Sequence, residues 1–115
     1  IFKKKRVIVT GSLQRYRDFI FIDDVVKALE KCINFKKYEI YNIGTGVKTK
    51  VRDIIKLIFK RLNLTSKNNI ILKKSSSGDT WGSYADIKRA VSSGWSPKTN
   101  IDLGLKKTII NIMKF

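Results

Sequence analysis

Residues 17–33 read Arg-Asp-Phe-Ile-Phe-Ile-Asp-Asp-Val-Val-Lys-Ala-Leu-Glu-Lys-Cys-Ile and place a short apolar run directly before a helical pattern. Asp23 and Asp24 follow the run at 19–22, where the cap and first turn of a helix favour acids. Apolar residues then recur every three or four positions as far as Ile33, which predicts an amphipathic helix packed on one face. Cys32 lies on that face, so we expect a packed residue rather than a reactive thiol.

On either side of this stretch, short strands alternate with helices. Apolar runs that end in turn-forming residues predict strands at 6–9, 39–43 and 70–72. Apolar positions that share one face predict further helices at 49–62, 86–94 and 101–113. Thr49 and Asp86 are the expected caps, and Gly94 with Pro97 ends the third helix. Because helices separate most of the strands, we predict an α/β fold with about four helices and partly parallel strands.

Length and composition exclude several classes of protein. The 115 residues are enough for one domain, and no apolar run reaches the roughly 18 residues that a membrane-spanning helix needs. The absence of histidine excludes Ser-His-Asp sites and histidine-bound metals, and a single cysteine excludes an internal disulfide. Without a secretory signal, we expect a cytoplasmic location. Because the chain begins with Ile1, we expect a processed product, a domain or a fragment.

The net charge of +16 allows two interpretations. Gathered on one face, it would favour binding to nucleic acid or to an anionic membrane surface. Alternatively, it reflects a lysine-rich composition, since 19 lysines accompany six arginines and most are spread along the chain. The second interpretation predicts no specific nucleic-acid partner and no membrane partner.

Two motifs resemble parts of a dehydrogenase but fit poorly. Gly44-Thr45-Gly46 follows an expected strand and precedes a helix, as a dinucleotide-binding turn does. The third glycine of that fingerprint is missing, however, so a tight structural turn is the simpler interpretation. Tyr84 and Lys88 have the Tyr-x-x-x-Lys spacing of reductases, but Tyr84 precedes the expected cap of its helix, so the two side chains should not lie one turn apart.

The candidate binding residues lie in two loops. Arg15 and Arg17 follow a glycine-containing turn and suit bidentate binding of phosphate, but they could equally form an exposed pair with Asp18. Asp79 lies beside Gly78, where a carboxylate could accept hydrogen bonds from sugar hydroxyls. It could instead bond its own backbone in the turn.

Several motifs in order then point to one family. From residue 11 to about 112 the chain resembles the C-terminal portion of the NAD-dependent epimerase/dehydratase family, extended short-chain dehydrogenases that act on nucleotide sugars, with UDP-glucose 4-epimerase the best-known type. Each motif is weak alone, but their order is specific. They are Arg17 to Val26, Tyr41 to Gly46, Gly78-Asp79, Ser83 to Ile87, Gly94 to Pro97 and Leu103 to Leu105.

The resemblance implies the C-terminal part of an extended Rossmann-type fold over residues 1–115, with the NAD fingerprint and the catalytic Tyr-x-x-x-Lys outside this chain. It implies that Arg17 contacts the pyrophosphate of a nucleotide sugar and that Asp79 contacts ribose hydroxyls. Many relatives carry a phosphate-binding arginine where this chain has Ser76, which could donate one weaker hydrogen bond. Lys73, Lys74 or Arg15 could compensate for the missing arginine. The complete enzyme is expected to bind NAD and to form a homodimer.

Three hypotheses therefore remain. The first is the nucleotide-sugar-binding segment of an epimerase or dehydratase, inactive alone and with an apolar face that the rest of the enzyme would cover. The second is a small basic nucleic-acid-binding module. The third is a free-standing remnant that packs against a partner supplying the nucleotide-binding half.

Overall fold

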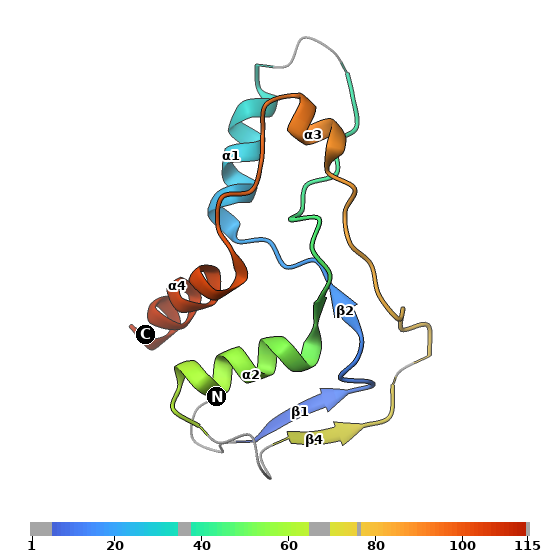
Figure 1. Ribbon diagram of the computed structural model, residues 1–115, viewed down its shortest axis with the longest axis vertical. Helices are drawn as coiled ribbons and strands as arrows, with labels where there is room; N and C mark the ends of the chain where they lie inside the picture. Colours follow the sequence, from blue (N-terminus) through green and yellow to red (C-terminus); the bar gives the residue numbers. More distant parts are fainter. Residues whose placement is uncertain (1–5, 35–37, 65–69, 76, 115) are drawn as a thin grey trace.

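The computed structural model describes residues 6–34, 38–64, 70–75 and 77–114, in which short strands alternate with helices (Figure 1). The predicted α/β class with four helices is confirmed. In chain order the elements are β1 (Val7–Thr10), β2 (Tyr16–Arg17), α1 (Ile22–Cys32), β3 (Thr49–Lys50), α2 (Val51–Arg61), β4 (Ile70–Lys73), α3 (Lys88–Ser92) and α4 (Ile101–Met113).

The strands form two small sheets. β1 pairs with β4 in parallel, with Val7 opposite Ile70, and α2 lies between these strands in the chain as the crossover that a parallel pair requires. β2 pairs with β3 in antiparallel fashion, with Arg17 opposite Thr49. The predicted strands at 6–9 and 70–72 and the partly parallel pairing are therefore confirmed.

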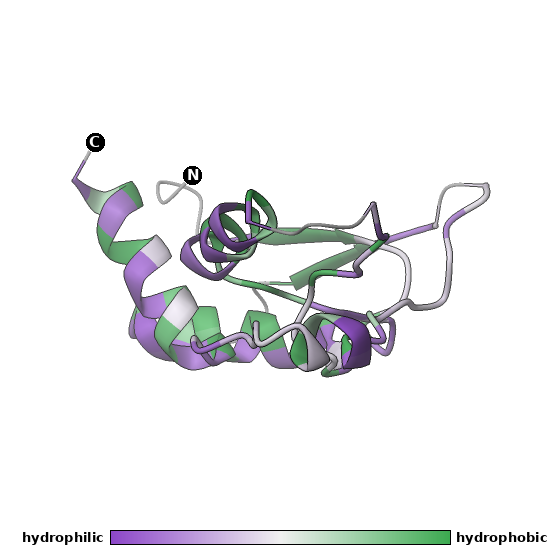
Figure 2. Ribbon diagram, turned by 90° about the horizontal axis from the view of Figure 1, so that it is seen from above, coloured by the Kyte–Doolittle hydropathy of each residue, from purple (hydrophilic) through white to green (hydrophobic). Residues whose placement is uncertain are grey.

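Two hydrophobic clusters hold these elements together. In the first, α2 packs on the β1–β4 sheet through Val9, Ile55 and Phe59. In the second, Ala28 of α1 and Ala90 of α3 pack around Trp95. Figure 2 shows hydrophobic and hydrophilic residues on different sides of the helices, as amphipathic sequences require. No helix within the described ranges has both the length and the apolar character to cross a bilayer.

Residues 39–43 do not form the predicted strand. A strand needs a neighbour for its backbone groups, and no described segment pairs with this one. Ile40 is 83% exposed, whereas Tyr41 and Ile43 are partly buried against the second hydrophobic cluster.

Three predicted helix caps are also corrected. The N-cap position of α1 is Phe21, and Asp24 is buried against another segment rather than capping its own helix. Thr49 belongs to β3, so Lys50 occupies the N-cap position of α2. Ile87 occupies that of α3, although the Asp86 carboxylate accepts a hydrogen bond from the Lys88 amide at 3.0 Å.

Candidate functional site

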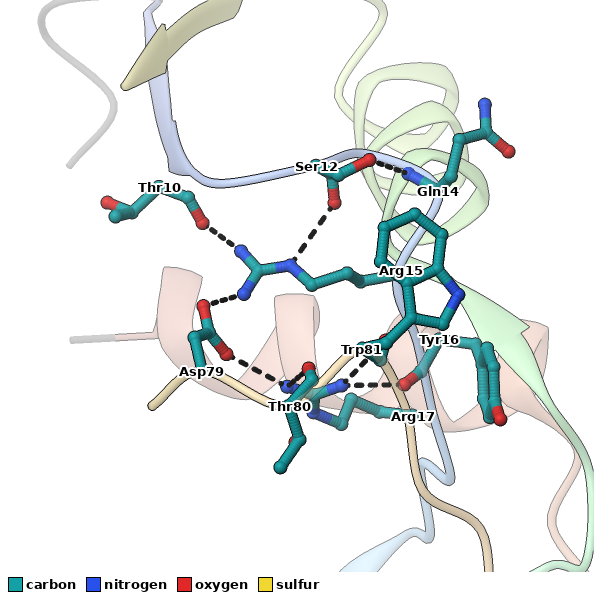
Figure 3. A network of polar contacts seen from close by, with 9 residues as sticks. All are labelled: Thr10, Ser12, Gln14, Arg15, Tyr16, Arg17, Asp79, Thr80 and Trp81. Carbon is teal, nitrogen blue, oxygen red and sulfur yellow. Dashed lines mark hydrogen bonds and ion pairs between the residues drawn. The ribbon is translucent and has the colours of Figure 1, made fainter. Parts of the chain in front are cut away.

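The candidate site forms where β2 meets the loop that follows β4, and it brings together three of the four predicted binding residues. Arg15 and Arg17 come from β2 and the residue before it, and Asp79 comes from the loop (Figure 3). A parallel bridge between Tyr16 and Gly82 fixes the loop to the strand. The fourth predicted residue, Ser76, lies outside the described residues.

Arg15 is the buried member of this group, with only 8% of its surface exposed. Its guanidinium forms an ion pair with Asp79 and donates hydrogen bonds to the carbonyl oxygens of Thr10 and, at 3.4 Å, of Ser12. Gly11 makes room for it, because a Cβ at position 11 would overlap the guanidinium and the backbone there has a φ of +90°. Arg15 therefore anchors Asp79 and the turn at 10–12.

Arg17 is more accessible, with one third of its side chain exposed. Nη2 donates to the Thr80 carbonyl oxygen at 3.1 Å and lies 3.4 Å from Oδ1 of Asp79. Nη1 donates to the carbonyl oxygens of Tyr16 at 2.8 Å and Trp81 at 3.5 Å. The carbonyl oxygens of the loop thus hold the Arg17 guanidinium in one orientation. Its 3.4 Å distance to Oδ1 of Asp79 is longer than that of a normal charge-assisted hydrogen bond.

Asp79 lies between the two guanidinium groups, so the cluster keeps a net positive charge. Such a cluster can attract an anion through Arg17, while the carboxylate can accept hydrogen bonds from hydroxyl groups. The predicted pairing of the two arginines with Asp18 is not formed, because Asp18 bonds other segments.

A pocket of about 320 Å³ lies between β3 and the connection that precedes α4. Thr49, which pairs with Arg17 across the sheet, contributes to its wall, and directly paired residues point to the same face. The other lining residues are Phe19, Thr45, Val47 and residues 97–101. Arg15, Arg17 and Asp79 are not among the residues that line this pocket.

Asp18 holds the glycine turn against this site. Its carboxylate accepts hydrogen bonds from the amides of Thr45 at 2.8 Å, Gly46 at 2.9 Å and Ala85 at 3.2 Å, and from the Thr45 hydroxyl. Burial alone would raise the pKa of Asp18, but these hydrogen bonds outweigh it and lower the pKa below its ordinary value. Gly44 is required here, because a Cβ would lie 2.6 Å from Oδ2 of Asp18.

These contacts also test whether the turn could hold NAD. A dinucleotide-binding turn uses its free backbone amides for the pyrophosphate. In this chain the amides of Thr45 and Gly46 already donate to Asp18. The turn therefore does not fit NAD, in agreement with its interpretation as a structural turn.

Tyr84 and Lys88 do not form a catalytic pair either. Lys88 is the first residue of α3, and Tyr84 lies in the preceding loop, so the helical spacing does not apply. A different lysine, Lys48, places its Nζ 4.5 Å from the centre of the Tyr84 ring. In the part of the chain that the structure describes, no cluster of acids and cysteine could hold a metal ion.

Sequence reasoning missed the importance of Asp24. The residue is 1% exposed, and its carboxylate accepts hydrogen bonds from the amides of Lys98 at 3.1 Å and Thr99 at 2.8 Å. Its carbonyl oxygen accepts a hydrogen bond from Nε1 of Trp95 at 3.1 Å. The position of Asp24 after an apolar run is also typical of a helix cap. Only its burial in the structure shows that its carboxylate bonds a distant segment instead.

The fold and the ordered motifs define a class, the Rossmann-type extended short-chain dehydrogenases. Residues 1–108 match the family described as GDP-mannose 4,6 dehydratase. The chain belongs to this family, within the NAD-dependent epimerases and dehydratases, and it corresponds to their C-terminal portion. The resemblance drawn from the motifs is thereby confirmed.

Individual relatives agree with this assignment. A Methanocaldococcus jannaschii protein provisionally named a UDP-glucose 4-epimerase is 35% identical over 112 residues, which cover 97% of this chain and 35% of that protein. An Escherichia coli dTDP-4-dehydro-6-deoxyglucose reductase is 33% identical over 90% of this chain and 33% of its own length. The chain thus spans about a third of the relatives that it matches.

The similarity extends to solved structures. The UDP-glucose 4-epimerase of Thermotoga maritima, solved with UDP-glucose, has a TM-score of 0.88 and 31% identity, over 95% of this chain and 35% of the epimerase. The UDP-glucuronic acid 4-epimerase of Bacillus cereus, solved with UDP-glucuronic acid and NAD, has a TM-score of 0.86 and 26% identity over the same shares.

Proposed function

We propose that this chain is the nucleotide-sugar-binding segment of an NAD-dependent sugar epimerase or dehydratase. The observation that carries the proposal is the contact between Arg17 and Asp79, which are 62 residues apart in the chain. Folding brings together a cation for phosphate and a carboxylate for hydroxyls. The UDP-glucose in the Thermotoga relative supports a ligand of this chemical class.

In this proposal Arg17 binds the pyrophosphate and Asp79 accepts hydrogen bonds from the ribose hydroxyls. Arg15 is buried and bonded to protein atoms, so we assign it to holding Asp79 rather than to direct contact with the ligand. A phosphate oxygen can displace the long contact between Arg17 and Asp79, because it offers a shorter charge-assisted bond. Ser76 remains a proposed second donor to phosphate.

The chemical step belongs to polypeptide outside these 115 residues. The family transfers a hydride between the sugar and NAD, and neither the turn at 44–46 nor the pair Tyr84 and Lys88 fits that chemistry. The segment would hold the nucleotide end so that the sugar reaches the reactive centre in a productive geometry. We therefore propose that the chain alone is inactive, and that the complete enzyme is a cytoplasmic homodimer.

The test is titration calorimetry of UDP-glucose into the chain and its Arg17→Ala variant. Loss of a charge-assisted phosphate contact should cost about 1.5 to 3 kcal/mol, or roughly a ten- to 150-fold weaker Kd. The control is Arg89→Ala, because Arg89 donates to the Ile40 carbonyl oxygen, away from the cluster. Equal affinity of the Arg17→Ala variant and the parent would remove Arg17 from the site.

A further inference from the structure

Trp81 presents a large aromatic surface at the edge of the proposed site. It is 61% exposed, whereas Trp95, the second tryptophan, is 6% exposed in the core. The indole N–H of Trp95 donates to Asp24, but that of Trp81 donates to no group within the described residues. Folding therefore leaves the Trp81 ring without the partners that tryptophan usually acquires when it packs.

The backbone of Trp81 is nevertheless held in place. Its carbonyl oxygen and that of Thr80 accept hydrogen bonds from Arg17, and Gly82 forms the bridge to Tyr16. Gly82 lies so close to the Tyr16 ring that a Cβ would come within 2.4 Å of it. The backbone at Trp81 is therefore held in place before a ligand arrives, while the ring stays exposed. This lowers the conformational entropy that the loop loses when a ligand binds.

We propose that the indole of Trp81 stacks on the nucleobase of the nucleoside diphosphate. The inference rests on the proposed function and names the group that holds the base. A nucleotide combines an anion with a flat aromatic ring, and in Figure 3 Trp81 lies next to Arg17, whose Nη1 donates to its carbonyl oxygen. Stacking uses the face of the base rather than its edge, so it accepts both pyrimidines and purines.

Tyr84 is the other exposed aromatic residue in this loop, but it is less suited to the task. It is 50% exposed, and Nζ of Lys48 lies 4.5 Å from the centre of its ring. Lys48 also approaches the Tyr16 ring, at 5.3 Å. One face of Tyr84 is therefore occupied by a cation, which makes Tyr84 a matched control for Trp81.

The experiment measures the Kd of UDP, GDP and inorganic pyrophosphate for the chain and three variants by calorimetry. Trp81→Leu should weaken both nucleotides by about tenfold or more and leave pyrophosphate unchanged, because pyrophosphate has no base. Trp81→Phe should restore most of the loss, and Tyr84→Leu should bind like the parent. The emission of Trp95 reports whether the Trp81 variants remain folded.

The outcomes separate this inference from the proposed function. If the parent binds UDP and Trp81→Leu binds it equally well, the stacking is wrong and the proposed function stands. If Trp81→Leu weakens pyrophosphate as much as UDP, Trp81 acts by positioning Arg17 and the stacking is again wrong. If the parent binds no nucleotide, both the proposed function and the inference are overturned.

Discussion

Asp18 follows Arg17 in the chain, yet the two neighbours serve different purposes. Arg17 faces the proposed ligand site, whereas Asp18 accepts hydrogen bonds from two separate segments, at 45–46 and at Ala85. It thereby fixes the turn that contributes Thr45 to the wall of the pocket. The role of Asp18 is therefore structural, although it is next to a proposed binding residue, because its partners include backbone amides of the chain itself.

Replacing Asp18 by Asn should destabilise the chain in a pH-dependent way. At pH 7 the variant should lose about 2 kcal/mol of unfolding free energy, because an amide group would face backbone donors. Since the pKa of Asp18 in the folded state lies below its ordinary 3.8, its contribution is present above that value and is lost as the pH falls through the lower folded pKa. Thermal unfolding from pH 7 downward measures the difference between the two proteins.

That difference should stay constant to about pH 4 and shrink below it. Asp53→Asn is the control, since Asp53 pairs only with Arg52 in a half-exposed contact at 3.3 Å, and such pairs contribute little. A stability difference that already disappears between pH 7 and pH 5 would contradict the assignment.

At the scale of elements, two residues of α1 hold the connection between α3 and α4: Lys31, whose Nζ donates to the Gly94 carbonyl oxygen at 2.9 Å, and the buried Asp24. Asp24 accepts hydrogen bonds from the amides of Lys98 and Thr99, and Trp95 donates to its carbonyl oxygen. The side chain of Asn100 then accepts a hydrogen bond from the Leu103 amide at 2.9 Å and caps α4. The direction in which α4 leaves the second cluster thus depends on the buried Asp24.

Asp24→Ala should therefore cost about 2 to 4 kcal/mol of unfolding free energy, because two partly buried amides lose their charged acceptor. The neighbouring Asp23→Ala is the matched control. Asp23 is exposed and reaches only Nζ of Lys107 at 3.3 Å, so its loss should cost less than about 1 kcal/mol. Denaturant unfolding measures both, and a red shift of Trp95 emission should accompany the first. Similar losses in both variants would contradict the distinction.

The elements that sequence reasoning predicted well are those with local determinants. The last helix was expected at 101–113 and runs from Ile101 to Met113. Its apolar periodicity and the residues at its ends lie within the segment itself, so no distant contact was needed to predict it. Residues 39–43 were predicted as a strand and are not one, since a strand also needs a partner. For the same reason the buried contacts of Asp24 could not be predicted from its neighbours.

The candidate site follows the same rule. The motif order predicted Arg17 and Asp79 as binding residues, and the contact of Arg15 and Arg17 with Asp79 agrees with their proposed use at one site. The burial of Arg15 and the exposure of Trp81 could not be predicted, because both depend on how a distant loop lies on β2. Local sequence specified the residue types, and tertiary contacts decide which side chains reach solvent.

On the scale of the whole molecule, the chain is more open than a self-sufficient domain. Its radius of gyration is 16.7 Å, against about 13 Å for a compact domain of roughly 100 residues. Its accessible surface is 8975 Å², whereas a folded monomer of 13.2 kDa should expose about 6,400 Å². Part of the exposed apolar surface lies on α1, where Ile22, Val26 and Leu29 are 62%, 45% and 62% exposed. This is the apolar face expected of a segment that packs against further polypeptide.

Two adjacent positions of α1 test this description of the molecule. Ala28 is 2% exposed against Trp95 and Ala90, so Ala28→Gln should lose about 2 kcal/mol or more through overpacking and a buried amide. Leu29 is 62% exposed, so Leu29→Gln should change the unfolding free energy by less than about 0.5 kcal/mol. Denaturant unfolding compares the two, and sedimentation at several concentrations reports self-association. If Leu29→Gln destabilises the monomeric chain as strongly as Ala28→Gln, then the outer face of α1 is packed within the chain, and no further polypeptide is needed to cover it.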